Sequence, residues 1–252
     1  MLESFSLEGK VAIVTGCNTG LGQGIAMGLA EAGCKVVGVN RSEPEDTVEI
    51  MSAAGHAFLD VRADLLKQEC IPGIIERTLA EFGQIDILVN NAGIIRREDA
   101  IEFSEQNWDD VMNVNTKTVF FMSQAVAKQF KVQGTGGKII NIASMLSFQG
   151  GIRVPSYTAS KSAVMGITRA MANEWARDNI NVNAIAPGYM ETNNTQALRD
   201  DVERNQAILE RIPAERWGTP QDIAGPCVFL ASSASDYING YTIAVDGGWL
   251  AR

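Results

Sequence analysis

The sequence predicts an α/β fold: a doubly wound, seven-stranded and mostly parallel sheet with helices on both faces. Short runs of β-branched residues alternate with longer helical patterns along the chain, which is typical of such a sheet. The first run, residues 11–15, leads into a glycine-rich turn and then a helix-forming stretch. The length of 252 residues, with 46% hydrophobic and 20% charged residues, suits a single core. We therefore interpret residues 1–252 as one domain.

Seven short apolar runs are the expected strands. They cover residues 11–15, 35–39, 56–60, 85–89, 137–143, 180–186 and 241–245. Ser42 and Glu45 stand at capping-box spacing, which predicts a helix with Ser42 as its N-cap after the second strand. Residues 188–218 mix polar residues with a charged helical pattern and are the expected lid-like segment within the domain.

The turn after the first strand indicates a phosphate-binding loop. Gly16 allows a tight turn, Gly20 lets the backbone approach a pyrophosphate, and Gly22 permits close packing of helix on strand. The start of the following helix supplies free N–H groups and the positive end of the helix dipole. The spacing is Thr-Gly-x-x-x-Gly-x-Gly rather than Gly-x-Gly-x-x-Gly. This pattern predicts a dinucleotide site on a Rossmann-type sheet.

Ser144, Tyr157 and Lys161 form a second candidate site. A phenol titrates near pH ~10 in water, so tyrosine exchanges protons near neutral pH only if something stabilises its anion. Lys161 stands four residues after Tyr157, and on a helix this spacing puts both on one face, about 5–6 Å apart. Ser144 follows an apolar run, where its hydroxyl would hydrogen-bond a substrate oxygen. The pattern indicates proton transfer without a histidine.

Composition argues against several classes of protein. The chain has 21 Lys and Arg against 30 Asp and Glu, a net charge of −9 at pH 7, so neither a nucleic acid nor an anionic membrane is the expected partner. The four cysteines form no Cys-x-x-Cys pair, which favours neither a metal site nor a disulfide framework. No apolar run reaches the ~20 residues of a membrane span, and the chain starts without a signal-peptide pattern. We expect a cytoplasmic protein without a metal.

Six ordered motifs give the chain its resemblance to a known family. They are Thr15 to Gly22, Asn90-Asn91-Ala92-Gly93, Asn115, Ser144, Tyr157-x-x-x-Lys161, and Pro187-Gly188 followed by Thr192. Together they span roughly residues 9 to 248, and the chain resembles the short-chain dehydrogenases/reductases. The resemblance implies hydride transfer between a nicotinamide cofactor and an alcohol or ketone, with the cofactor carrying the redox chemistry.

The resemblance also implies roles for individual residues. Tyr157 would transfer the proton, Ser144 would polarise the substrate oxygen, and Lys161 would favour the Tyr157 phenolate and hold the ribose hydroxyls. Asn115 would kink its helix and hold a proton-relay water. Asp64 is preferred to Asp60 on the adenine side, with Asp60 ending the third strand. The expected cofactor-binding residues are Gly16, Asn18, Thr19, Gly20, Leu21, Gly22, Asn40, Arg41, Asp64, Leu65, Asn91, Ala92, Gly93, Tyr157, Lys161, Pro187, Gly188, Met190 and Thr192.

The signals for the cofactor conflict, and together they favour NAD(H) over NADP(H). An acidic residue ending the second strand would bind the adenosine ribose and repel a 2′-phosphate, but neutral Asn40 stands there. Arg41 follows and would attract that phosphate. Thr19 occupies the position where NADP-dependent relatives carry a second basic residue, so the expected phosphate site has only one cation.

Within the family, the closer resemblance is to enzymes that act on six-carbon keto sugar acids from pectin breakdown, usually homotetramers. Residues 93–99, 143–157 and 239–252 carry it. We expect an anionic sugar-acid substrate whose carboxylate is bound by Arg153, assisted by Gln149 and Arg96. A 3-oxoacyl carrier-protein reductase, another sugar or polyol dehydrogenase, and a non-enzymatic dinucleotide-binding regulator remain as alternatives. The expected substrate-binding residues are Ser144, Gln149, Arg153, Tyr157 and Trp217.

Overall fold

A seven-stranded sheet forms the centre of the computed structural model, which describes residues 2–252. The strands lie in the order β3-β2-β1-β4-β5-β6-β7, and every neighbouring pair is parallel. The predicted α/β sheet is confirmed, and all seven strands are parallel rather than most of them. Their bounds are β1 Val11–Thr15, β2 Lys35–Asn40, β3 Phe58–Arg62, β4 Ile87–Asn90, β5 Gly137–Ile142, β6 Ile180–Pro187 and β7 Thr242–Val245.

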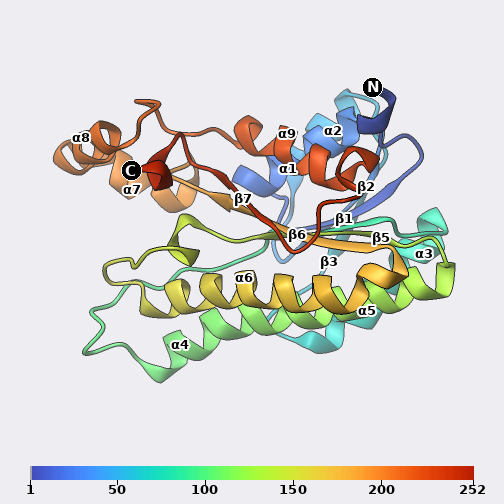
Figure 1. The fold of residues 1–252 in the computed structure, drawn as a ribbon, viewed down its shortest axis with the longest axis horizontal. Coiled ribbons are helices and arrows are strands. Elements are labelled where there is room, and N and C mark those ends of the chain that lie inside the picture. Colours follow the sequence, from blue (N-terminus) through green and yellow to red (C-terminus); the bar gives the residue numbers. More distant parts are fainter. Residues whose placement is uncertain (1) are drawn as a thin grey trace.

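Helices cover both faces of this sheet (Figure 1). One face carries α1 (Gly20–Glu31), α2 (Glu45–Ala53) and α9 (Pro220–Ala231), whose apolar residues share a core with the sheet. The other carries α3 (Ile71–Phe82), α5 (Val119–Gln133) and α6 (Pro155–Trp175), which share a second core. Because both faces are covered, the strands read as continuous apolar runs, and all five residues of β1 are buried.

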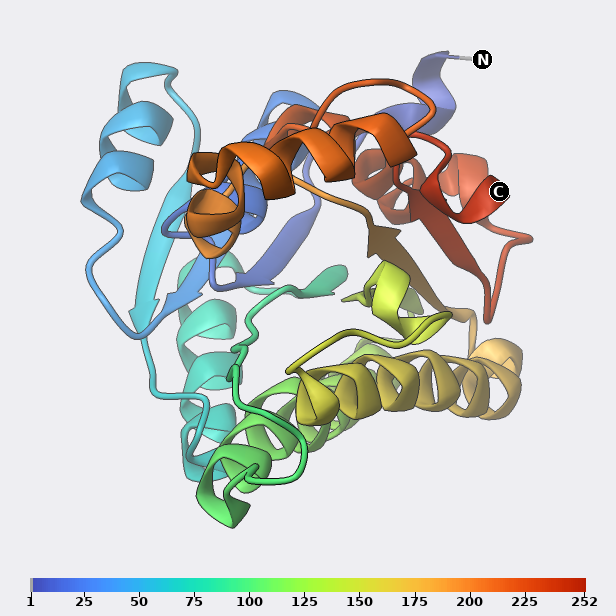
Figure 2. The same cartoon turned by 90° about the vertical axis from the view of Figure 1, so that its left-hand side faces the viewer.

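Three further α-helices complete the fold. The helix α4 (Glu105–Met112) precedes a π-helical segment, Asn113–Thr118, that leads into α5. The helices α7 (Gln196–Asp200) and α8 (Val202–Arg211), drawn in orange, lie across the strand ends in Figure 2. Strand order reverses between β1 and β4, and in open parallel sheets such a reversal leaves a crevice at the carboxyl ends.

Two local predictions are wrong. Ser42 does not cap α2: the helix begins at Glu45 with Pro44 at its N-cap, and the Ser42 hydroxyl accepts a hydrogen bond from Asn18 Nδ2 at 2.8 Å. The third strand starts and ends two residues later than predicted, so Asp60 lies within β3, opposite Gly38, and does not end it. Both errors arise because contacts with distant parts of the chain decide at which residue a helix or strand starts.

Candidate active site

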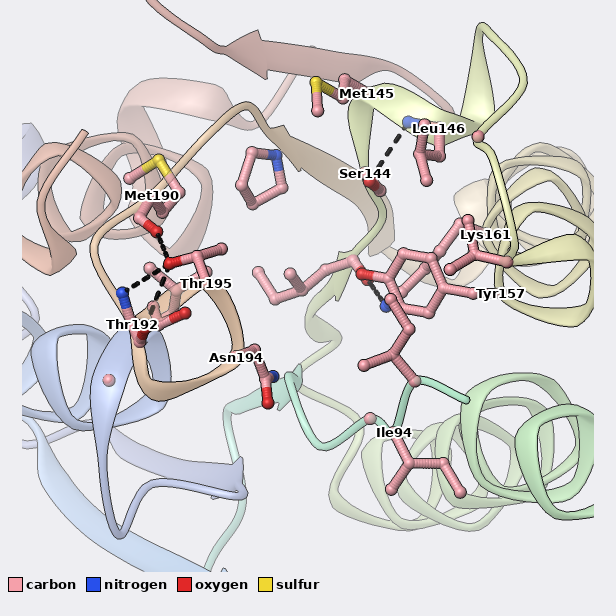
Figure 3. Close-up of a pocket in the computed structure, with 18 of the residues that line it drawn as sticks. Ile94, Ser144, Met145, Leu146, Tyr157, Lys161, Met190, Thr192, Asn194 and Thr195 are labelled. Atoms are coloured by element: carbon pink, nitrogen blue, oxygen red, sulfur yellow. Dashed lines mark hydrogen bonds between the residues drawn. The ribbon is translucent and has the colours of Figure 1, made fainter. Parts of the chain in front are cut away.

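A cavity of about 780 Å³ lies at the carboxyl ends of the central strands. Its walls come from the turns after β1, β4, β5 and β6, from the start of α6, and from α7 and α8. It contains the glycine-rich turn as well as Ser144, Tyr157 and Lys161, so the two sites predicted from separate motifs form one site. In Figure 3, Ser144, Tyr157 and Lys161 lie on the opposite side of this space from Met190, Thr192 and Thr195.

The glycine-rich turn has the shape that a pyrophosphate requires. Gly16 and Gly20 have φ angles of +66° and +56°, in the left-handed region that favours glycine. A Cβ at residue 22 would collide with the carbonyl of Gly16, so the turn closes against α1 only with glycine there. Thr19 at the N-cap provides no side-chain hydrogen bond, so the first N–H groups of α1 are left for an anion in the cavity.

Asn91 and Thr15 brace this turn from behind. Thr15 Oγ1 accepts hydrogen bonds from the backbone N–H groups of Asn91 and Ala92, at 3.0 and 2.9 Å. Asn91 Nδ2 in turn donates to the carbonyls of Thr15 and Gly16, at 3.0 and 2.9 Å. These bonds join the end of β1 to the end of β4, the two strands between which the order reverses.

Asn115 is fully buried in the π-helical segment, where it holds the loop after β4. Its Oδ1 accepts from the Ile94 N–H at 2.8 Å, and its Nδ2 donates to the Ile94 carbonyl at 2.9 Å and to Ser160 Oγ at 3.1 Å. The predicted irregularity in the helix is present as a π-bulge, which brings Asn115 within reach of α6.

Ser144 lies just beyond the end of β5, with its hydroxyl close to Tyr157. Its Oγ accepts a hydrogen bond from the Leu146 N–H at 3.1 Å, which leaves the hydroxyl proton available to a substrate oxygen. Tyr157 stands in the first turn of α6, and Lys161 stands one turn further along the same face. The Lys161 Nζ lies 5.6 Å from the centroid of the Tyr157 ring.

Burial moves the pKa values of both Tyr157 and Lys161. It raises the pKa of Tyr157, while the Ser144 hydroxyl and the positive charge of Arg97 lower that pKa in part. Burial also lowers the pKa of Lys161 from 10.5 to about 8. Lys161 is 4% exposed, and its Nζ donates to the Ile142 carbonyl at 2.6 Å. Arg97, from the loop after β4, is thus a cation that offsets part of the effect of burial on the pKa of Tyr157.

Most residues predicted to bind the cofactor line the cavity, but Asn18 and Asn40 do not. Asn40 is 2% exposed, and its Oδ1 accepts from the Cys17 N–H at 2.9 Å while its Nδ2 donates to Asp60. We therefore correct the expected role of Asn40: it supports the glycine-rich turn. The predicted cofactor residues that line the cavity are Gly16, Thr19, Gly20, Leu21, Gly22, Arg41, Asp64, Leu65, Asn91, Ala92, Gly93, Tyr157, Lys161, Pro187, Gly188, Met190 and Thr192.

Two of the residues predicted to bind substrate lie outside the cavity. Arg153 has a φ of +63° and turns its guanidinium to Asp99, with Nε 2.8 Å from Oδ1. Trp217 is buried and donates from Nε1 to Asn205 Oδ1 at 2.8 Å. Ser144, Gln149 and Tyr157 do line the cavity. The loop that holds Arg153 does border the cavity, but the direction of its side chain depends on Asp99, which spacing does not reveal.

Besides Arg41, four arginines line the cavity. Arg96, which was predicted to assist Arg153, and Arg97 come from the loop after β4, and Arg204 and Arg211 come from α8. Arg96 pairs with Asp110 at 3.5 Å, and Arg97 donates to the Asn194 carbonyl at 3.2 Å. Among residues 2–252, no group of three or more His, Cys, Asp or Glu side chains is placed to hold a metal ion.

The fold and the cofactor turn define a dinucleotide-binding α/β protein, and comparison with known proteins shows its family. A family model described as enoyl-(acyl carrier protein) reductase matches residues 16–250. Together with full-length relatives, this match shows that the chain belongs to the short-chain dehydrogenase/reductase family.

Individual relatives are similar over the whole chain. The 2-dehydro-3-deoxy-D-gluconate 5-dehydrogenase of Escherichia coli strain K12 is 73% identical over 252 residues, which is all of both chains. A solved structure from Agrobacterium tumefaciens with bound NADP is 57% identical, covers 99% of each chain and has a TM-score of 0.94. A gluconate 5-dehydrogenase from Burkholderia cenocepacia J2315, solved with NADP and tartrate, is 39% identical, with a TM-score of 0.94 over 100% of this chain and 99% of that chain.

Proposed function

We propose that the protein is an NAD(P)-dependent oxidoreductase that interconverts a secondary alcohol and a ketone on a keto-deoxy sugar acid. The reaction of 2-dehydro-3-deoxy-D-gluconate 5-dehydrogenase, in the breakdown of pectin-derived uronates, is the specific activity that we propose. The observation that carries the reaction class is the convergence of Ser144, Tyr157 and Lys161 on the cavity that holds the glycine-rich turn. The relative that is 73% identical over its whole length supports the substrate.

The residues present suit a nicotinamide cofactor, which supplies the hydride acceptor or donor when bound. The N–H groups at the start of α1 would bind its pyrophosphate, and Lys161 would hold the hydroxyls of its ribose. Tyr157 donates its phenolic proton to the substrate oxygen during reduction and accepts a proton from the alcohol during oxidation. The Ser144 hydroxyl orients that oxygen by donating a hydrogen bond to it.

Gly93 supports the proposed proton relay between Lys161 and Asn115. A Cβ at residue 93 would lie 3.2 Å from Asn115 Oδ1 and 3.8 Å from Lys161 Nζ. The space between these two side chains therefore exists because residue 93 has no side chain. A water there would accept from the Lys161 ammonium and donate to Asn115 Oδ1, whose second lone pair is not used by the Ile94 N–H.

The preference for NAD(H) over NADP(H) stays a prediction, and the cavity supports binding of both cofactors. No acidic side chain stands at the end of β2 to repel a 2′-phosphate, because Asn40 occupies that position. Arg41, the next residue, is exposed and lines the cavity. The Agrobacterium tumefaciens relative was solved with NADP.

A panel of keto and hydroxy sugar acids tests the proposed function. Each acid is supplied with NADH or NADPH, or with the oxidised cofactor, and absorbance of the reduced nicotinamide is followed. We expect turnover of 2-dehydro-3-deoxy-D-gluconate or its ketone product to exceed that of neutral sugars. A 3-oxoacyl thioester belongs in the panel, because a 3-oxoacyl carrier-protein reductase is one of the alternatives that the sequence leaves open. Faster turnover of the thioester would refute the sugar-acid assignment.

The proposed assembly is a homotetramer in the cytoplasm. Helix α5 exposes Phe121 and Val132, which are 39% and 80% accessible in the single chain. A second copy packed along α5 and α6 would cover them. Light scattering coupled to size-exclusion chromatography measures the mass directly. Within residues 2–252, no helix is both long and apolar enough to cross a membrane.

A further inference from the structure

One face of α8 forms part of the cavity wall. Arg204, Ala207, Ile208 and Arg211 all line the cavity, and their spacing of three, four and seven residues places them on one side of a helix. Ile208 is buried in a small core with Met145, Trp217 and Trp249. The packing of Ile208 fixes which side of α8 faces the cavity, and that side presents two arginines.

Arg211 is held in place by an aromatic ring. Its guanidinium carbon lies 3.9 Å from the centroid of the Trp249 ring. Trp249 is 4% exposed, donates from Nε1 to Gln149 Oε1 at 3.2 Å, and packs edge-on against Tyr189 with the ring centroids 4.8 Å apart. Stacking occupies the flat face of a guanidinium and leaves the N–H donors at its edge free to hydrogen-bond a planar anion.

The two arginines of α8 have no anionic partner among residues 2–252, and this separates them from Arg96 and Arg153. Arg96 is paired with Asp110 and Arg153 with Asp99. Within the described part of the chain, neither Arg204 nor Arg211 has a carboxylate within salt-bridge distance, and neither side chain donates a hydrogen bond. An unpaired guanidinium held against a cavity wall is suited to binding an anionic ligand.

Arg211 and Ser144 line the same cavity, and a chain of contacts through Trp249 links them. Gln149, which accepts the hydrogen bond of Trp249, lies in the segment that follows Ser144, and its own N–H donates to the Met145 carbonyl at 3.3 Å. The Trp249 ring is thereby tied to the segment that carries Ser144. Arg97, in contrast, lies close enough to Tyr157 to lower its pKa, so it belongs to the reacting end.

We propose that Arg211, supported by the charge of Arg204, binds the carboxylate of the substrate and selects sugar acids over neutral sugars. This inference rests on the proposed function, because it assigns the acid group of that substrate to a residue. It replaces Arg153, whose guanidinium is taken by Asp99. The carboxylate would receive two parallel N–H bonds from Arg211 while the reacting oxygen meets Ser144 and Tyr157.

The test compares one keto sugar acid with its primary amide, which has nearly the same shape but no charge. Arg211→Met should raise the KM for the acid by about tenfold or more, equivalent to about 1.4 kcal/mol. It should change the KM for the amide by less than about threefold, because only the charged interaction is lost. Arg211→Lys should recover part of the loss, since it keeps the charge without the planar pair of donors. Arg153→Met is the matched control and should change neither KM.

Two further measurements separate the possible outcomes. Binding of the oxidised or reduced cofactor should be the same in wild type and Arg211→Met, which excludes a collapsed cavity. Equal increases in KM for acid and amide would show that Arg211 only supports α8 through Trp249, and would overturn the inference while leaving the proposed function intact. A wild-type protein that neither turns over nor binds any sugar acid in calorimetry would overturn both.

Discussion

Replacing Lys161 with methionine should stabilise the fold near neutral pH while abolishing activity. The pKa of Lys161 falls from 10.5 to about 8 on burial, a difference that corresponds to about 3 kcal/mol of free energy against the charged form at pH 7. Methionine fills a similar volume without a charge. It leaves the Ile142 carbonyl without the Lys161 donor, which costs about 1–3 kcal/mol. The net gain at pH 7 is therefore only about 1 kcal/mol.

The sharper measurement is how the difference in free energy of unfolding between wild type and Lys161→Met changes with pH. Because the folded pKa of Lys161 lies below the unfolded one, the folded wild type binds fewer protons than the unfolded chain between about pH 8 and 10.5. Raising the pH through this window stabilises wild type and does not act on the methionine variant. The advantage of Lys161→Met should fall by about 2–3 kcal/mol between pH 7 and pH 10, and its sign should reverse.

Urea unfolding of both proteins at pH 7, 8.5 and 10, at equal protein concentration, gives this difference. Lys67→Met is a suitable control, because Lys67 is exposed to water and its removal should produce a difference that barely changes with pH. If the stability advantage of Lys161→Met stays constant or grows as the pH rises, the reasoning is refuted. That result would mean that groups other than the Ile142 carbonyl also stabilise the Lys161 ammonium.

Three other substitutions test the proposed site. Tyr157→Phe should reduce turnover by orders of magnitude and leave cofactor binding nearly intact, because the ring remains and the transferable proton is lost; more than about a tenth of wild-type turnover would exclude Tyr157 as the proton donor. Arg41→Ala should lower kcat/KM with NADPH about tenfold relative to NADH, and an unchanged ratio would show that Arg41 does not contact the 2′-phosphate. Gly93→Ala should lower kcat about tenfold or more in a folded protein, because its methyl group enters the space between Asn115 and Lys161; an unchanged kcat and pH profile would remove the relay water from the mechanism.

The sheet architecture could be predicted from the sequence because each strand is marked by a local pattern of residues. All seven predicted strands are present, since a strand buried on both faces needs a continuous apolar run that few other elements show. Strand and helix ends were less accessible. Ser42 has the correct spacing for an N-cap, but Asn18 from another turn donates to its hydroxyl, and Pro44 precedes the first helical residue instead. Such partners come from distant parts of the chain.

In the candidate site, the backbone features were predictable from sequence, but the directions of the side chains were not. The glycine-rich turn was predictable because Gly16, Gly20 and Gly22 are required by backbone geometry and close packing. The direction of a side chain depends on which partner is nearest in space. Arg153 turns to Asp99, and Asn40 turns inward to Cys17, although the residues on either side of each line the cavity.

The arginines of the cavity reconcile a net charge of −9 with the proposed anionic substrate. Acidic groups elsewhere repel an anion at long range, but that repulsion between exposed charges is screened over about 8–10 Å of physiological salt solution. Inside a cavity the nearest unpaired charges dominate, because the low-dielectric walls concentrate their field. Arg97 from the loop after β4 and Arg204 and Arg211 from α8 all line this space. The local sign of the charge is therefore opposite to the overall sign, so net charge, which argues against nucleic acid as a partner, does not argue against an acidic metabolite.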